Sequence, residues 1–327
     1  MRTDFTEAQL ADPDTAASNQ VLRTCTHCGF CTATCPTYLL LGDELDSPRG
    51  RIWLLKDMLS GAAPPTADTV KHIDRCLSCL ACMTTCPSGV HYMHLVDHGR
   101  RWIERHYRRP WAERSLRRLL GAVLTRPGLF RPALIAAVFA KPFARLLPPP
   151  LRPLLTLAPA SVPAPSSTER PQIFPAKGER RMRVALLPGC AQLVLAPEIN
   201  EATIRLLTRH GCEVVVANGS GCCGSLAHHL GQEEAALAFA RADIDAWERE
   251  RLAAGLDAIA VNASGCGTTV KDYGFMLRQD PAYAEKAARV AALARDVVEI
   301  IDLLDLRAAP AGFPGAGRRV AYHSACS

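Results

Sequence analysis

The sequence predicts an α+β protein, in which a helical N-terminal part precedes an α/β part with a mainly parallel sheet. Three observations predict this division. Eight of the fourteen cysteines lie in two copies of one motif near the N-terminus. A stretch rich in Pro, Ala and Ser, at residues 158–175, marks a boundary. Beyond it, short apolar runs alternate with helical patterns, as in βαβ units. The 327 residues, 48% of them hydrophobic, suffice for two or three domains with packed cores.

The duplicated motif is Cys-x2-Cys-x2-Cys-x3-Cys-Pro. Its cysteines are Cys25, Cys28, Cys31 and Cys35 in the first copy and Cys76, Cys79, Cys82 and Cys86 in the second. This spacing is typical of bacterial ferredoxins with two [4Fe–4S] clusters, in which the fourth cysteine of each run binds the other cluster. The predicted ligand sets are Cys25, Cys28, Cys31 and Cys86 for one cluster, and Cys76, Cys79, Cys82 and Cys35 for the other. Two zinc sites are the alternative, because CxxC is also a zinc motif, but evenly stepped triplets favour clusters.

In the second part, we expect strands at residues 183–187, 213–217 and 258–262, and the start of another at 319–322. Helices are expected at 197–210, from 225 to about 254, at 268–278 and at 283–306. Strands that alternate with helices predict a parallel sheet, with ligands at the carboxyl ends of the strands.

A second set of cysteines follows these strand ends: Cys190, the adjacent pair Cys222 and Cys223 before Gly224, and Cys266. Because the strand ends share one edge of the sheet, the four thiols could converge and hold a soft metal or a third cluster. The alternative is that they line an interface or a buried turn without metal, and both interpretations stay open. Cys212, at a predicted strand start, is expected to be a small core residue.

A basic stretch from Arg100 to Arg152 carries thirteen Arg or Lys residues and two acids, a net charge of +11. Basic residues interleaved with apolar ones could lie on an anionic membrane surface or dock an acidic partner subunit. The alternative is an amphipathic packing segment with a solvated charged face. Prolines and arginines interrupt every apolar run before it reaches the length of a bilayer span. No nucleic-acid module accompanies the charge.

The sequence shows no GxGxxG run opening a helix after a strand, and no acid/base constellation for substrate chemistry. No secretory signal is visible, so we expect a cytoplasmic protein whose thiols stay reduced. Two arginines between the cluster motifs, Arg49 and Arg51, supply guanidinium groups that would stabilise reduced, more negative clusters. The alternative is that they are ordinary surface arginines at a helix start.

Several segments together resemble glycolate oxidase (glycolate dehydrogenase) iron–sulfur subunits. These segments are residues 28–38, 42–51, 85–90 and 263–274. The Cys190, Cys222-Cys223-Gly224 and Cys266 arrangement resembles the cysteine-rich CCG domain of these subunits, of glycerol-3-phosphate dehydrogenase subunits and of heterodisulfide reductase. That domain ordinarily ends in a CxxC pair, whereas Ala263 occupies the first position here.

The resemblance implies an electron-transfer subunit without substrate chemistry of its own. An FAD-binding partner would oxidise glycolate to glyoxylate, and the clusters would relay electrons toward a quinone or another acceptor, in the cytoplasm or peripherally on the cytoplasmic face of the inner membrane. A glycerol-3-phosphate or lactate dehydrogenase subunit, a CCG-domain disulfide reductase and a structural zinc protein are the alternatives. The segments expected are a ferredoxin-type bis-[4Fe–4S] domain at 1–110, a basic, Pro-rich amphipathic segment and linker at 111–175, a CCG domain at 176–318, and the start of a truncated second CCG repeat at 319–327.

Overall fold

The computed structural model describes residues 1–61, 64–146 and 152–304, together with 317, 319 and 321. The chain divides into two compact units. The first unit contains Met1–Arg114 and Leu226–Glu233, and the second contains Ser115–Ser225 and the described residues from Glu234 onward. The strand expected at 319–322 and the expected second repeat fall outside the continuous described segments, and the predicted domain boundaries stay predictions.

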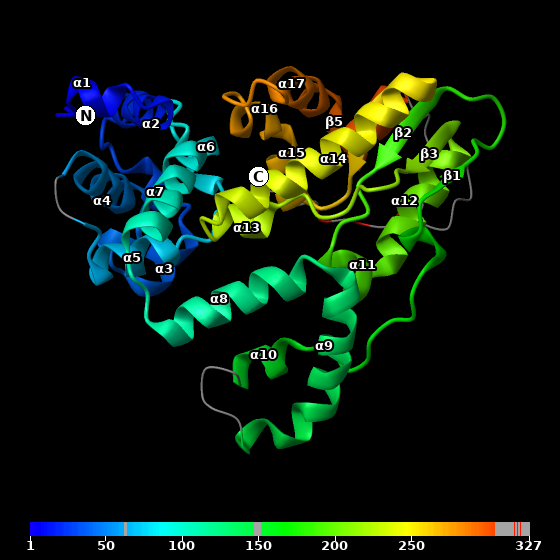
Figure 1. Ribbon diagram of the computed structural model, residues 1–327, viewed down its shortest axis with the longest axis horizontal. Coiled ribbons are helices and arrows are strands. Elements are labelled where there is room, and N and C mark those ends of the chain that lie inside the picture. Colours follow the sequence, from blue (N-terminus) through cyan, green and yellow to red (C-terminus); the bar gives the residue numbers. More distant parts are fainter. Residues whose placement is uncertain (62–63, 147–151, 305–316, 318, 320, 322–327) are drawn as a thin grey trace. The chain divides into compact units, whose positions relative to one another are not determined.

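The first unit is helical, as expected (Figure 1). Its elements up to α7 are α1 (Glu7–Leu10), α2 (Pro13–Thr24), η1 (Phe30–Thr32), α3 (Pro36–Leu41), η2 (Glu44–Asp46), α4 (Pro48–Ser60), α5 (Ala67–Asp74), α6 (Ala81–Thr84) and α7 (Tyr92–His106). Helices α2, α4, α5 and α7 bury one apolar cluster, which includes Leu22, Leu55, Ile73 and Leu95. This cluster holds the two cysteine loops in place between the helices.

Local sequence explains where the helix that separates the two loops begins. The Ser47 hydroxyl accepts a hydrogen bond from the Gly50 amide at 2.9 Å, and Pro48 occupies the first helical position of α4. A serine cap satisfies an amide that has no partner within the helix, and proline fixes the backbone angle needed there. Helix α7 packs against α4 so closely that a side chain at Gly99 would meet the Leu55 side chain.

The second unit opens with helices and continues into the sheet. Helix α8 (Trp111–Leu124) leads into it, followed by α9 (Pro127–Ala140), η3 (Lys141–Leu146), α10 (Arg152–Leu157) and η5 (Ser167–Glu169). Within the described residues, no single helix has the length and apolar composition to cross a bilayer. Helix α8 and the α9–η3 segment satisfy that test only as a pair, and they are bent by 112°.

The sheet has five strands in the order β1-β3-β2-β4-β5, and its last three pairings are parallel. The strands are β1 (Gln172–Phe174), β2 (Met182–Leu186), β3 (Cys212–Val216), β4 (Ala258–Val261) and β5 (Ala294–Asp296). The helices that connect or follow them are α11 (Ala191–Leu195), α12 (Pro197–Arg209), α13 (Ser225–His229), α14 (Glu233–Ala254), α15 (Ser264–Lys271), α16 (Tyr273–Met276), α17 (Ala284–Leu293) and α18 (Val297–Leu303). The predicted α+β class with a mainly parallel sheet is confirmed.

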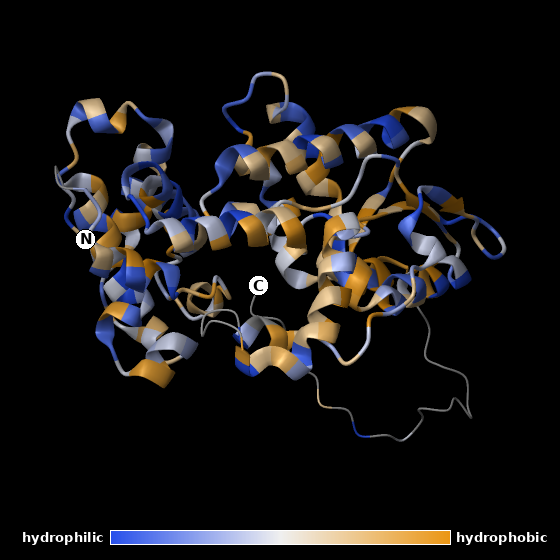
Figure 2. Ribbon diagram, turned by 60° about the horizontal axis from the view of Figure 1, so that its bottom comes forward, coloured by the Kyte–Doolittle hydropathy of each residue, from blue (hydrophilic) through white to orange (hydrophobic). Residues whose placement is uncertain are grey.

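Both faces of the sheet are covered. Ala185 and Leu187 face the cluster built by α14, α15 and α17, whereas Val184 and Leu186 face the cluster of α12 and α18. Strands buried on both faces are almost entirely apolar, and Figure 2 shows the central strands mainly in hydrophobic colours. Cys212 packs in the second of these clusters, as expected.

Three elements expected after residue 157 differ in the structure. The linker expected at 158–175 contains β1, which pairs antiparallel with β3. The long helix expected after Gly224 breaks between α13 and α14, where Gly231 has a positive φ of 76°. The helix expected at 283–306 is interrupted by β5, because Asp296 caps a new helix with Glu299 in a capping box.

Candidate iron–sulfur and thiol sites

The eight motif cysteines line two neighbouring pockets in the first unit. One pocket is lined by Cys25, Cys28, Cys31 and Cys86 and also touches Cys82. The other is lined by Cys35, Cys76, Cys79 and Cys82. Each pocket therefore brings together three cysteines of one motif copy and the fourth cysteine of the other copy.

The two loops that carry the triplets share an unusual backbone. His27 and Ser78 occupy the same position in the two motif copies, and both have positive φ angles, of 57° and 52°. Gly29 and Leu80 also correspond, with φ of 87° and 61°. Left-handed backbone is uncommon for residues other than glycine and is concentrated at functional sites, where the surrounding structure enforces it. The loops turn tightly enough to bring each triplet of sulfur atoms to one pocket.

The donor chemistry of both pockets fits iron–sulfur clusters. Among the described residues that line them, none is Asp or Glu, and thiolates are the ligands that such clusters use. Burial, together with the neighbouring thiols of Cys25 and Cys86, raises the pKa of Cys31 to about 11. Burial and adjacent cysteines also raise the pKa of Cys82. Because four gathered thiolates repel one another, they need a positively charged centre to be deprotonated together.

Several groups outside the motifs contact this site. The Tyr92 hydroxyl lies 3.7 Å from Cys76 Sγ, and the buried Arg100 donates hydrogen bonds of 2.5 Å to the Cys76 carbonyl and the Ser78 hydroxyl. Thr37 Oγ1 lies 3.2 Å from Cys35 Sγ. The motif spacing gave no signal for Tyr92 and Arg100, because both reach the site through the fold, whereas Thr37 directly follows the Cys-Pro of the first motif copy.

The four cysteines of the second unit also converge. Their thiols form a hydrogen-bonded chain in the order Cys190, Cys222, Cys223, Cys266. Hydrogen bonds from the Cys190 and Cys223 thiols lower the pKa of Cys222, and the Gly224 amide, 3.4 Å from its sulfur, acts in the same direction. The predicted convergence at the strand ends is therefore present in the structure, and metal binding there stays a prediction.

The sheet explains why these thiols meet. Cys190 follows β2 and Cys266 follows β4, and these two strands are neighbours in the sheet. From β2 the chain continues to β3 on one side, and from β4 it continues to β5 on the other side. In α/β folds, this switch point is where ligands bind. A polar network joins the two strand ends: Asn200 donates to the Pro188 carbonyl at 2.9 Å, and Asn262 donates to Asn200 at 2.8 Å.

The adjacent cysteines are held from behind by buried groups. Gly224 has a φ of 81°, and a Cβ atom there would lie 2.8 Å from the Ala236 carbonyl, so the turn after Cys223 requires glycine. The Tyr273 hydroxyl donates to the Cys223 carbonyl at 2.9 Å. Asp243 accepts a hydrogen bond from the Gly221 amide at 2.8 Å, and burial raises the pKa of Asp243 to about 7.

Family models match both halves of this arrangement. A 4Fe-4S dicluster domain matches residues 21–90, and a cysteine-rich domain matches residues 184–271. The glycolate oxidase iron–sulfur subunit of Escherichia coli (strain K12) is 46% identical over 301 residues, which are 92% of this chain and 70% of that protein. The chain belongs to the family of glycolate oxidase iron–sulfur subunits. It is an electron-transfer component of an oxidoreductase.

Two other relatives match smaller shares of this chain. The probable glycolate oxidase iron–sulfur subunit of Bacillus subtilis (strain 168) is 33% identical over 87% of this chain and 66% of its own length. Lactate utilization protein A of Geobacillus thermodenitrificans is 29% identical over 44% of this chain. The chain thus spans about two thirds of the length of the two glycolate oxidase subunits. No solved structure matches.

Proposed function

We propose that this chain carries electrons from glycolate oxidation through two [4Fe–4S] clusters, one at each cysteine pocket. The observation that carries the proposal is the pairing of the cysteines: each pocket gathers a complete set of four thiols from both motif copies. Such clusters supply one-electron transfer. The residues of this chain hold and orient the centres.

The substrate chemistry belongs to a partner in this proposal. Oxidation of glycolate to glyoxylate releases two electrons and two protons, and a flavin such as FAD on a partner subunit can accept the pair and pass the electrons on singly. A quinone or another acceptor takes both electrons at the end. The names of the Escherichia coli and Bacillus subtilis relatives support glycolate as the substrate. Over less than half of the chain, the Geobacillus thermodenitrificans relative favours lactate as the second candidate.

Anaerobically prepared chain should contain about eight irons and eight sulfides at the two pockets. Mixed with its flavoprotein partner and an excess of glycolate, it should lose the visible absorbance of the oxidised clusters. The same mixture with lactate or glycerol 3-phosphate should react much more slowly, and the chain without the flavoprotein should not react. Zinc in place of iron would contradict the cluster assignment, and faster reduction by lactate would contradict the substrate.

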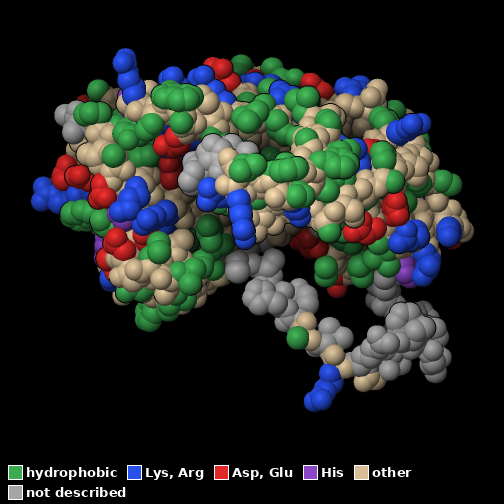
Figure 3. Space-filling view, turned by 90° about the horizontal axis from the view of Figure 1, so that it is seen from below, with side chains coloured by type: hydrophobic (Ala, Val, Ile, Leu, Met, Phe, Trp, Pro, Cys, Tyr) green, Lys and Arg blue, Asp and Glu red, His purple; other side chains and the backbone are tan. Residues whose placement is uncertain are grey.

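We also propose that the helices α9, η3 and α10 rest on an anionic membrane surface. No Asp or Glu occurs between Glu113 and Glu169, whereas eight Arg or Lys residues do. Within the same helices, Phe139, Phe143 and Leu157 are exposed to 76%, 61% and 82%. In the view of Figure 3, hydrophobic and basic side chains lie next to each other on the surface. Basic residues beside exposed apolar ones are typical of segments that lie in a lipid interface.

This attachment should be peripheral and sensitive to salt, because charges are screened within about 3 Å at 1 M ionic strength. The complex should bind anionic vesicles and not neutral ones, and 1 M salt should release it. Exchanging Phe139 and Phe143 together for serine should weaken vesicle binding about tenfold or more, since burying each ring contributes on the order of 1 kcal/mol or more.

The matched control is Leu252→Ser, because Leu252 is exposed to 74% on α14 of the same unit. This control should leave vesicle binding unchanged. Equal binding to neutral and anionic vesicles would overturn the proposal, and so would equal losses in the phenylalanine and Leu252 variants. If the protein instead has no membrane contact, fractionation of cells at low salt should recover it in the cytoplasmic fraction and not in the membrane fraction.

A further inference from the structure

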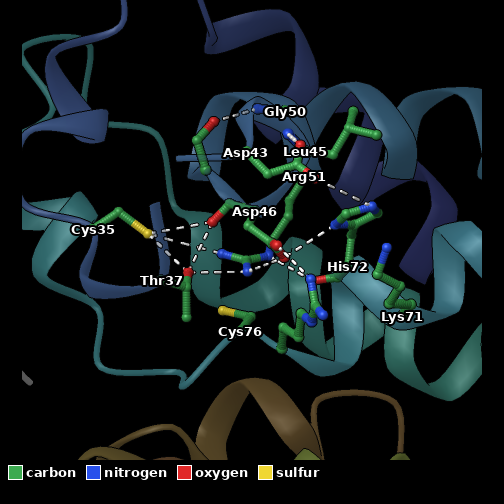
Figure 4. Close-up of polar contacts among 12 residues, drawn as sticks. Cys35, Thr37, Asp43, Leu45, Asp46, Gly50, Arg51, Lys71, His72 and Cys76 are labelled. Carbon is green, nitrogen blue, oxygen red and sulfur yellow. Dashed lines mark hydrogen bonds and ion pairs between the residues drawn. The ribbon is translucent and has the colours of Figure 1, made fainter. Parts of the chain in front are cut away.

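One cluster pocket has a buried guanidinium group beside a cysteine sulfur. Arg51 is only 1% exposed, and its Nη1 lies 3.8 Å from Cys35 Sγ (Figure 4). Its Nε donates to the His72 carbonyl at 2.7 Å, and its Nη2 donates to Thr37 Oγ1 at 3.0 Å. These hydrogen bonds fix the planar group in one orientation, with one edge toward the sulfur.

Arg51 shares a buried carboxylate with two other donors. Asp46 is fully buried, and its carboxylate accepts hydrogen bonds from Arg51 at 3.2 Å, from Arg75 at 2.8 Å and from His72 at 3.0 Å. Of the two guanidinium groups at this carboxylate, only that of Arg51 is buried, since the Arg75 side chain is 42% exposed.

Two further acids near His72 are exposed to solvent. Asp43 and Asp68 lie 4.0 and 3.6 Å from His72 Nε2, and their side chains are 43% and 65% exposed. Exposed charges are screened by water and salt. Asp43, Asp46 and His72 have the spacing of a metal site, but both arginines already occupy the Asp46 carboxylate.

Among the described residues, the other pocket has no buried guanidinium group beside a sulfur, and the Met1 ammonium there donates to the Cys25 carbonyl at 2.7 Å. Arg49 lies beside Cys31, but its side chain is 36% exposed and its Nε is paired with Glu44 at 2.7 Å. A solvated arginine that is neutralised by one acid exerts a weak field on a neighbouring sulfur. The two arginines that look alike in sequence therefore differ in burial and in contact with a cysteine sulfur.

Reduction adds one negative charge to a cluster, and hydrogen bonds to its sulfurs and buried positive charge favour the reduced form. We propose that Arg51 raises the reduction potential of the centre at Cys35, Cys76, Cys79 and Cys82 above that of the centre at Cys25, Cys28, Cys31 and Cys86. At equilibrium, the first electron then occupies the centre at Cys35, Cys76, Cys79 and Cys82. This inference rests on the proposed function, because it requires both pockets to hold clusters.

The test is a potentiometric titration of the anaerobic, cluster-loaded chain, followed by EPR. Arg51→Met should lower one of the two midpoint potentials so that the equilibrium constant for reduction falls about tenfold or more, which is 59 mV for a one-electron couple. The affected centre is the one that Cys35→Ser perturbs. Arg49→Met is the matched control and should leave both midpoints where they are.

Because Arg51 is buried, its removal could prevent cluster assembly, and Thr37 supplies a second variant. Thr37→Val removes the hydroxyl that orients Arg51 beside Cys35 Sγ and should shift the same midpoint in the same direction, whereas Thr37→Ser should restore it. Unchanged midpoints in the loaded Thr37→Val protein, or a shift of the other centre, would overturn the inference. A wild-type chain that binds no iron would instead contradict the proposed function.

Discussion

Cys35→Ser should abolish or strongly alter the centre at Cys76, Cys79 and Cys82 while the centre at Cys25, Cys28 and Cys31 persists. The reason is geometric, because Cys35 lines the pocket of the second triplet although it belongs to the first motif copy. Iron content should fall from about eight to about four per chain if the altered cluster is lost. Iron and sulfide analysis, together with EPR of the reduced protein, measures the change.

The reciprocal variant provides the matched control. Cys86→Ser should affect the centre at Cys25, Cys28 and Cys31, because Cys86 lines that pocket. The two variants should therefore abolish different EPR signals, and the interaction between the two centres should disappear in both. If Cys35→Ser removed only the signal that Cys86→Ser was expected to remove, the exchange of fourth ligands between the motif copies would be wrong.

Local patterns in the sequence were sufficient for the cysteines and the central strands. A triplet of cysteines at fixed spacing forms its site within one loop, so its position does not depend on the rest of the fold. Strands β2, β3 and β4 are buried on both faces and therefore stand out as apolar runs. Their order along the chain, with a helix after each, is enough to predict that Cys190 and Cys266 meet at one edge.

The strands at the sheet edges gave no such signal. Strand β1 is three residues long with Ile173 exposed, and β5 has two charged residues after the buried Ala294. Short edge strands are stabilised by pairing with a neighbour more than by their own side chains, so a single-sequence pattern misses them.

The network around Arg51 could not be predicted for a different reason. Asp46, His72 and Arg75 are polar residues of the kind found at surfaces, and they meet only because η2 packs against α5. The sequence alone does not indicate whether Arg49 or Arg51 lies beside a cluster. Burial separates them, and burial is a property of the fold.

Changing Cys222 and Cys223 together to serine should abolish any metal bound by the second unit and leave the two cluster pockets unaffected. These residues are the two central members of the thiol chain, so their loss leaves Cys190 and Cys266 without a connecting ligand. If the four thiols hold a third cluster, the full chain should bind about twelve irons after anaerobic reconstitution, and the double variant about eight. Cys212→Ala is the matched control, because Cys212 is a buried cysteine of the same unit outside the thiol chain, and it should retain all the metal.

Two features of the site set the expected kind of metal binding. Four thiols are a sufficient ligand set for a cubane cluster or for one zinc ion, and Ala263 supplies no fifth sulfur. Metal analysis of the double variant therefore distinguishes a cluster from a zinc ion, because the variant would lose iron in the first case and zinc in the second. The hypothesis is wrong if the wild-type chain binds no more metal than the double variant and all four thiols react with a thiol reagent in the native protein. The thiol chain, held by Gly224 and Tyr273, would then serve as a structural element behind the switch point of the sheet.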